Sequence, residues 1–223
     1  MSQPACRLYL ISPPALLNLS IFAERLSNAF SGGDIGAFQL RLKDAHAEEV
    51  LAAARALRPI AHAHGCAFIL NDRPDLALQC GADGVHLGQD DLPAWPIAKA
   101  RTLLGEEAII GVSAHASRHL AMEAGEQGAD YVAFGAFFPT KSKPPAKIER
   151  WGTPTPEIIA WWSAYTVLPC TAIGGMTPAN CAPLLEAGAD FIAAITYVWE
   201  HAEGPGAAVR EFNTAFKQAI KGK

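Results

Sequence analysis

Short apolar runs alternate with longer amphipathic segments along the chain. The runs are rich in β-branched, aromatic and other apolar residues, and several are apolar on both faces. That pattern is typical of parallel strands that helices cover. Eight such runs predict strands at 7–12, 37–42, 67–71, 83–87, 108–113, 130–135, 168–174 and 191–196.

The segments between these runs predict helices. In the first segment, Ile21, Phe22, Leu26 and Phe30 fall on roughly one face. Proline opens several of the others, which suits the first helical turn because that position needs no N–H donor. The predicted helices cover 20–30, 45–63, 74–80, 93–104, 117–127, 154–164, 178–187 and 207–220.

Eight alternating strand and helix units predict the fold class. We expect an α/β protein, a (β/α)8 TIM barrel, formed as a single domain by residues 1–223. At about 28 residues per unit, the chain has the size of such a barrel with few insertions. A doubly wound open sheet is the alternative. The eight units, and the lack of a Gly-x-Gly-x-x-Gly motif after the first run, argue against it.

A Gly-Ala-Asp tripeptide precedes three of the predicted strands. It occurs at 81–83, 128–130 and 188–190, two units apart each time. Glycine commonly ends a helix, so each tripeptide is interpreted as the joint between one helix and the next strand. The repeat is therefore structural.

Composition and charge limit the classes of partner and the compartment. Of 223 residues, 50% are hydrophobic and 18% charged, and the net charge is −4, which gives no reason to expect nucleic acid or a membrane surface as partner. No apolar run approaches the roughly 20 residues of a membrane span, and the first residues lack the pattern of a signal peptide. The five scattered cysteines, without a Cys-x-x-Cys motif, predict buried, reduced thiols in a cytoplasmic protein.

In a barrel of this kind the active site lies at the carboxyl ends of the strands, so the residues after each run carry the information. Gln39, Arg41 and Lys43 alternate at the end of the second run, so they share one face, which we expect to point into the barrel mouth. Two cations on that face need an anion. In the alternative interpretation this face lies outward under the helices, but the apolar residues between the three take that side.

Acidic and amide side chains follow the third and fourth runs. Asn71 and Asp72 end the third run, and Asp90 and Asp91 follow the fourth. Carboxylates from neighbouring strand ends, beside inward cations, fit a Mg²⁺ site that holds a diphosphate, because Mg²⁺ takes one or two carboxylates together with substrate phosphates. Each acid precedes a proline-led segment, so the alternative is that it caps a helix. The neighbouring cations favour the metal.

The later strand ends suggest a second anion site. Gly174 and Gly175 permit a close backbone approach after the seventh run, and the eighth run ends at Ile195 and Thr196. Loops after these two strands commonly bind phosphate in barrel enzymes. Ser113 lies near the mouth at the end of the fifth run, where helix capping is the alternative, and His115 is interpreted as a loop histidine.

Six motifs in order resemble the thiamine-phosphate synthase family. They are "QLRLKD", "NDRPDLAL", "GADGVHLGQDDLP", "IIGVSAH", "GADYVAFGAFFPTKSK" and "AIGGMTPAN…AGADF", which together span about residues 8–196. The resemblance implies a transferase that condenses hydroxymethylpyrimidine diphosphate with a thiazole phosphate, or its carboxylated tautomer. The products would be thiamine phosphate and pyrophosphate, and Mg²⁺ would be the cofactor.

The resemblance also implies roles for individual residues. Asp72 and Asp91 would bind Mg²⁺, and Asp90 should point elsewhere. Arg41, Lys43, Ser113 and Lys143 would be catalytic around the diphosphate. The substrate-binding set would be Gln39, Leu40, Arg41, Leu42, Lys43, Asn71, Ser113, Thr140, Lys141, Ser142, Lys143, Gly175, Ile195 and Thr196. The sequence departs from the family in having Ser142 where threonine is usual and Thr196 where serine is usual.

Two other functions remain as alternatives. A thiazole tautomerase of a related barrel would aromatise the thiazole without condensation, and it would need no diphosphate or metal site. A regulatory barrel would bind thiamine phosphates without turnover. Pyrophosphate release that needs both substrates would discriminate among them. The oligomeric state is open, since Trp161 and Trp162 could cover the barrel or form an interface between copies in a homo-oligomer.

Overall fold

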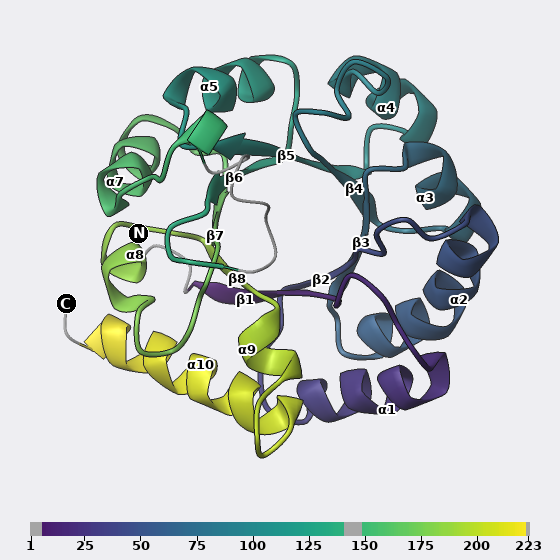
Figure 1. Cartoon of the computed structure of the whole chain (residues 1–223). Helices are drawn as coiled ribbons and strands as arrows, with labels where there is room; N and C mark the ends of the chain where they lie inside the picture. The colour runs from purple at the N-terminus through teal and green to yellow at the C-terminus, as the bar shows by residue number, and fades with distance from the viewer. Residues whose placement is uncertain (1–5, 141–148, 222–223) are drawn as a thin grey trace.

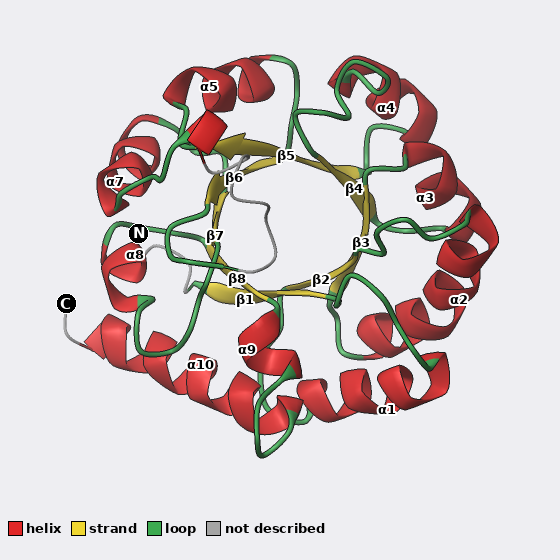
Figure 2. Ribbon diagram, viewed as in Figure 1, coloured by secondary structure: helices red, strands yellow, loops and turns green. Residues whose placement is uncertain are grey.

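Eight parallel strands close into a barrel in the computed structural model, which describes residues 6–140 and 149–221. Each strand pairs in parallel with its neighbours along the chain, and β8 pairs with β1 to complete the ring (Figures 1 and 2). The TIM-barrel prediction is confirmed. The strands are β1 Arg7–Ile11, β2 Ala37–Leu40, β3 Ala67–Asn71, β4 Gly84–Leu87, β5 Ile109–His115, β6 Tyr131–Gly135, β7 Cys170–Ile173 and β8 Phe191–Ala194.

Helices surround this barrel on its outer side (Figure 2). They are α1 Leu19–Phe30, α2 Ala47–Ala63, α3 Pro74–Cys80, α4 Ile97–Leu104, α5 Arg118–Glu126, α7 Pro156–Tyr165, α8 Ala182–Glu186, α9 Thr196–Trp199 and α10 Pro205–Lys221. None of the helices in the described part of the chain combines the length and the apolar character that a membrane crossing requires.

Several predicted elements differ from those observed. The predicted strand 37–42 ends at Leu40, and the predicted helix 178–187 is confined to Ala182–Glu186. Further differences lie at α4 and after β8. The predicted helix 93–104 begins only at Ile97, because the chain first makes turns and Pro96 adopts an extended conformation as the N-cap. The predicted strand 191–196 ends at Ala194, and the short helix α9 follows. Trp199 anchors α9: its indole N–H donates to the carbonyl of Ile11 at 2.7 Å, and its ring packs 4.7 Å from that of Phe22.

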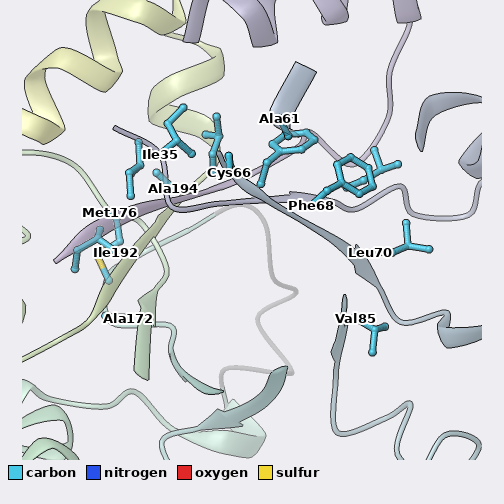
Figure 3. Close-up of a cluster of buried hydrophobic side chains, with 14 of the residues drawn as sticks. Ile35, Ala61, Cys66, Phe68, Leu70, Val85, Ala172, Met176, Ile192 and Ala194 are labelled. Atoms are coloured by element: carbon cyan, nitrogen blue, oxygen red, sulfur yellow. The ribbon is translucent and has the colours of Figure 1, made fainter. Parts of the chain in front are cut away.

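Alternation along the strands separates two hydrophobic clusters. In β2, Phe38 and Leu40 point outward into the main core between barrel and helices, and both are almost completely buried. Figure 3 shows part of this core, including Phe68 and Leu70 from β3. The inward residues form a smaller cluster inside the barrel, made of Tyr9, Ile11, Ala37, Ile69, Tyr131 and Ala193. The side chains that line the site therefore come from the inward positions.

The three Gly-Ala-Asp aspartates join neighbouring strands, as their structural interpretation predicted. Each carboxylate accepts a hydrogen bond from a backbone N–H of the preceding strand, and the aspartate's own N–H donates to the carbonyl of that same residue. The N–H···carboxylate distances are 2.6 Å from Phe68 to Asp83, 2.7 Å from Ile110 to Asp130 and 2.8 Å from Cys170 to Asp190. The repeat therefore fixes the register of β3–β4, β5–β6 and β7–β8.

We expect Asp190→Ala to lower the free energy of unfolding by about 1–3 kcal/mol, because it leaves the partly buried N–H of Cys170 without its acceptor. Chemical denaturation measures this loss. Asp190→Asn is the matched control, since its side-chain oxygen still accepts, and it should lose less. Equal losses in both variants would mean that the charge, and not the hydrogen bond, stabilises this joint.

All five cysteines are free, and four of them are buried. Burial raises the pKa of the Cys66 and Cys170 thiols to about 12. Cys6 is only partly exposed. The absence of disulfides agrees with the predicted thiols, of which Cys6 alone is not fully buried. The raised pKa values keep Cys66 and Cys170 protonated at neutral pH, which makes them poor nucleophiles.

Candidate active site

A cavity of about 180 Å³ opens at the carboxyl ends of β2 to β5 and reaches into the barrel. Eight of the predicted site residues line it: Gln39, Arg41, Lys43, Asn71, Asp72, Asp91, Ser113 and Ile195. The alternation predicted for the second strand is confirmed, because its three polar residues line the cavity while Leu40 lies in the outer core. The barrel thus brings two cations and two carboxylates to one opening.

The two carboxylates of Asp72 and Asp91 lie within hydrogen-bonding distance of each other. Burial and the neighbouring charge of Asp91 raise the pKa of Asp72 to about 7, although Arg41 opposes this shift. Burial also lowers the pKa of Arg41, and the two aspartates counteract that effect. Carboxylates this close need a proton or a cation between them.

Local backbone conformation places both acids. Asp72 follows β3 directly and has a φ of 62°, in the left-handed region that non-glycine residues seldom adopt. It does not cap α3, whose N-cap is Arg73. The carboxylate of Asp91 accepts the N–H of Gly88 at 3.0 Å, which closes the turn after β4, and the next helix begins only at Ile97. The helix-cap alternative therefore fails for both residues.

Asp90 differs from its expected position. It borders the cavity, although we expected it to point elsewhere. Its side chain is 53% exposed, and its carboxylate lies 3.9 Å from the guanidinium of Arg150. A strand end that turns immediately, as β4 does, leaves consecutive side chains near the same opening.

The donor set of this cavity suits a magnesium ion better than a structural zinc. Within residues 6–140 and 149–221, no group of three or more His, Cys, Asp and Glu side chains could enclose a metal. Zinc sites usually take three or four such protein ligands. Mg²⁺ commonly uses one or two carboxylates and completes its shell with water and phosphate oxygens. Asp72 and Asp91 fit that pattern.

The floor of the cavity is a network of polar side chains, of which sequence reasoning predicted Gln39 and Ser113 but missed Tyr9, His86 and Tyr131. The hydroxyls of Tyr9 and Tyr131 are 2.7 Å apart, and the amide of Gln39 donates to Tyr9 at 2.9 Å. His86 bridges Tyr131 and Ser113 through its two ring nitrogens, at 2.9 Å each. The sequence did contain a signal for this network, namely polar residues at inward positions of apolar strands. His86, for example, stands in the middle of the apolar strand β4.

Ser113 and His115 both belong to β5. The N-cap of the following helix α5 is Ser117, so the capping alternative for Ser113 fails. His115 is the last residue of the strand and buried, not a loop histidine. Its ring stacks on that of Trp151 with centroids 4.7 Å apart, at the edge of the cavity.

A second cavity of about 320 Å³ adjoins the first at the ends of β6 to β8. Thr140, Gly175, Ile195 and Thr196 line it, as the predicted second anion site requires. Gly175 has a φ of 62°, and a Cβ there would lie 2.5 Å from the carbonyl oxygen of Pro139, so no larger residue fits. The two cavities share Ile173, Ala193 and Ile195.

Some predicted residues do not line either cavity. The side chains of Leu40 and Leu42 pack in the outer core, so only their backbone could reach a ligand. Lys141, Ser142 and Lys143 lie outside the described residues. Their predicted roles remain predictions.

Comparison with known proteins adds the family to this geometry. A family model described as thiamine monophosphate synthase matches residues 8–198. The chain is 53% identical to a thiamine-phosphate synthase of Rhodospirillum centenum over 212 residues, which cover 95% of this chain and 98% of the relative. The chain belongs to the thiamine-phosphate synthase family. Membership makes it an enzyme, a transferase of thiamine biosynthesis.

Other members and solved structures agree with this family. A thiamine-phosphate synthase of Hyphomonas neptunium is 47% identical, with 96% of each chain covered. The solved thiamine phosphate pyrophosphorylase of Pyrococcus furiosus superposes with a TM-score of 0.81 at 31% identity, covering 96% of both chains. A GGGPS of Thermoplasma volcanium, 14% identical with a TM-score of 0.71, shares the fold.

Proposed function

We propose that this member of the family condenses hydroxymethylpyrimidine diphosphate with a thiazole phosphate, or its carboxylated tautomer, and that the reaction needs Mg²⁺. The products are thiamine phosphate and pyrophosphate, together with CO₂ when the acceptor is the carboxylated tautomer. The observation that carries the proposal is the meeting of Arg41, Lys43, Asp72 and Asp91 at one cavity mouth beside a second, glycine-lined cavity.

The bond that breaks joins the exocyclic carbon of the pyrimidine to the diphosphate oxygen. Negative charge develops on the departing diphosphate, so groups that stabilise this charge accelerate the step. Arg41 and Lys43 both line the first cavity, and the partly buried guanidinium of Arg41 acts there with little screening by water. By resemblance, Lys143 adds a third cation.

Asp72 and Asp91 would hold the magnesium ion. Mg²⁺ bound there would neutralise charge on the diphosphate oxygens as the C–O bond breaks. The mutual contact of the two carboxylates supports this role, because a cation relieves their repulsion. Asn71, which hydrogen-bonds to Asp72, helps to orient that carboxylate.

The second cavity supplies the acceptor. A thiazole phosphate held by the backbone at Gly175 and by Thr196 would place its ring toward Ile173, Ala193 and Ile195, which border both cavities. The thiazole nitrogen then forms the C–N bond with the pyrimidine carbon that has lost pyrophosphate. No protein nucleophile takes part, because the aminopyrimidine ring delocalises the positive charge.

Product identification tests the proposal. Purified protein is incubated with hydroxymethylpyrimidine diphosphate, MgCl₂ and either the thiazole phosphate or its carboxylated tautomer, and each mixture is analysed by mass spectrometry. We expect thiamine phosphate. If the thiazole carboxylate is aromatised while no thiamine phosphate forms, the tautomerase alternative is correct, and binding of thiamine phosphate without either reaction would indicate a regulatory barrel.

We expect Thr196→Val to raise the KM for the thiazole phosphate about tenfold to a hundredfold, because it removes a hydroxyl from the second cavity while keeping the shape. Steady-state kinetics should give a KM for the pyrimidine diphosphate within about twofold of the wild-type value. A lost hydrogen bond would shift this KM by roughly twofold or more. Thr102→Val, on the exposed face of α4, is the matched control. A changed KM for the pyrimidine diphosphate alone would mean that the two anions occupy each other's sites.

A further inference from the structure

Thr171 places a hydroxyl inside the barrel that the described part of the protein does not satisfy. The residue lies on β7 with its side chain toward the first cavity, and it is only 2% exposed. Its Oγ1 has no hydrogen-bond partner among the described residues. A hydroxyl buried in this way lowers the stability of the free protein, so its presence calls for a reason.

Unlike Thr171, the neighbouring polar side chains in the cavity have hydrogen-bond partners. Ser113 and His86 bond to each other on the floor of the same cavity, and the two tyrosines there do likewise. Ala133 on β6 stands in register between Ser113 on one side and Thr171 on the other. Its small side chain leaves the space between Ser113 and Thr171 to the cavity, which both of these residues line.

We propose that Thr171 binds the planar nitrogen heterocycle of the diphosphate substrate, with its hydroxyl hydrogen-bonded to the polar edge of the ring. The inference rests on the proposed function, because the cations at the cavity mouth then hold the diphosphate. With the diphosphate at the mouth, the attached ring occupies the interior, where Thr171 lies. A threonine hydroxyl both donates and accepts, so it suits either a ring nitrogen or an amino group.

This role predicts opposite effects on the free protein and on the complex. Thr171→Val keeps the shape and removes only the hydroxyl, so the free protein no longer buries an unsatisfied polar atom and its Tm should rise by about 1–4 °C. The ligand, in contrast, loses a partner. A threonine that served packing alone would give no loss of ligand affinity in the valine variant.

The experiment compares wild type, Thr171→Val and Thr171→Ser. For each, calorimetry gives the Kd of hydroxymethylpyrimidine diphosphate and that of inorganic pyrophosphate, both with Mg²⁺, and thermal denaturation gives the Tm. We expect the valine variant to bind the pyrimidine diphosphate about tenfold more weakly, because a polar atom of the ligand loses its hydrogen-bond partner. The Kd of pyrophosphate should be unchanged. The serine variant, which keeps the hydroxyl, should bind the pyrimidine diphosphate nearly as wild type does.

Three outcomes overturn the inference. Equal Kd values of the pyrimidine diphosphate for wild type and Thr171→Val would leave Thr171 as a wall residue, and normal thiamine phosphate formation by both would show that the proposed function survives. An equal weakening of pyrophosphate would mean that the substitution disturbs the cavity mouth and not the ring. Failure of the wild type to bind the pyrimidine diphosphate at all would overturn the proposed function as well.

Discussion

We expect Asp72→Asn and Asp91→Asn each to lower kcat by about 10²- to 10³-fold. Both carboxylates line the first cavity and contact each other, and together they are the acidic pair that would hold Mg²⁺. Losing one metal ligand removes several kcal/mol of stabilisation from the departing diphosphate, and each 1.4 kcal/mol is about a factor of ten in rate. Steady-state kinetics at saturating substrates measures the effect, and circular dichroism checks that the barrel is intact.

A nearby carboxylate outside the cavity provides the control. Asp75 on α3 pairs with Arg73 at 2.6 Å and does not line the cavity. Asp75→Asn removes the same charge three residues from Asp72, and its kcat should stay near that of wild type. Near-wild-type rates for Asp72→Asn and Asp91→Asn at limiting Mg²⁺ would show that the metal is held elsewhere or that none is needed.

We expect the second large effect from Arg41→Gln, which should lower kcat/KM by about 10²-fold. The guanidinium is partly buried beside Asp72 and Asp91, and a cation in that environment acts on a diphosphate more strongly than an exposed one. Arg41→Lys keeps the charge but loses the planar pair of donors, so it should recover only part of the activity. The two constants, kcat and KM, separate transition-state stabilisation from simple substrate binding.

An exposed arginine near the same opening tests whether charge alone matters. Arg150 is 66% exposed and pairs with Asp90. We expect Arg150→Gln to change kcat/KM less than about fivefold, because an exposed ion pair contributes only about 0–1 kcal/mol. If Arg150→Gln and Arg41→Gln lost activity equally, the rim would act as a diffuse positive field, and the specific role of Arg41 would be wrong.

Hydrophobic periodicity was enough to predict the barrel, because eight strand-like runs that alternate with helical segments, several of them apolar on both faces, have few other arrangements. It did not predict α9, since the apolar residues 191–199 continue a strand-like pattern. What ends the strand there is tertiary: Trp199 reaches across to the carbonyl of Ile11 and to the ring of Phe22. Contacts between residues so far apart in the chain leave no local pattern.

The sequence predicted the residues at the rim of the site better than the contacts on its floor. Gln39, Arg41 and Lys43 stand at alternate positions at the end of one apolar run and just after it, so that run alone predicts their common face. The pair His86–Ser113 spans two strands, and only the register of β4 against β5 brings the two side chains together. Sequence alone does not give that register, and Thr171 was missed for the same reason.

The most direct test of the account is the rate of pyrophosphate release by the wild-type protein as MgCl₂ is varied, with both substrates present and with each omitted in turn. The account predicts release only when hydroxymethylpyrimidine diphosphate, thiazole phosphate and Mg²⁺ are all present, at a rate that saturates with Mg²⁺ and matches the appearance of thiamine phosphate. Release that is unchanged when the thiazole phosphate is omitted, or that persists fully in EDTA, would contradict it.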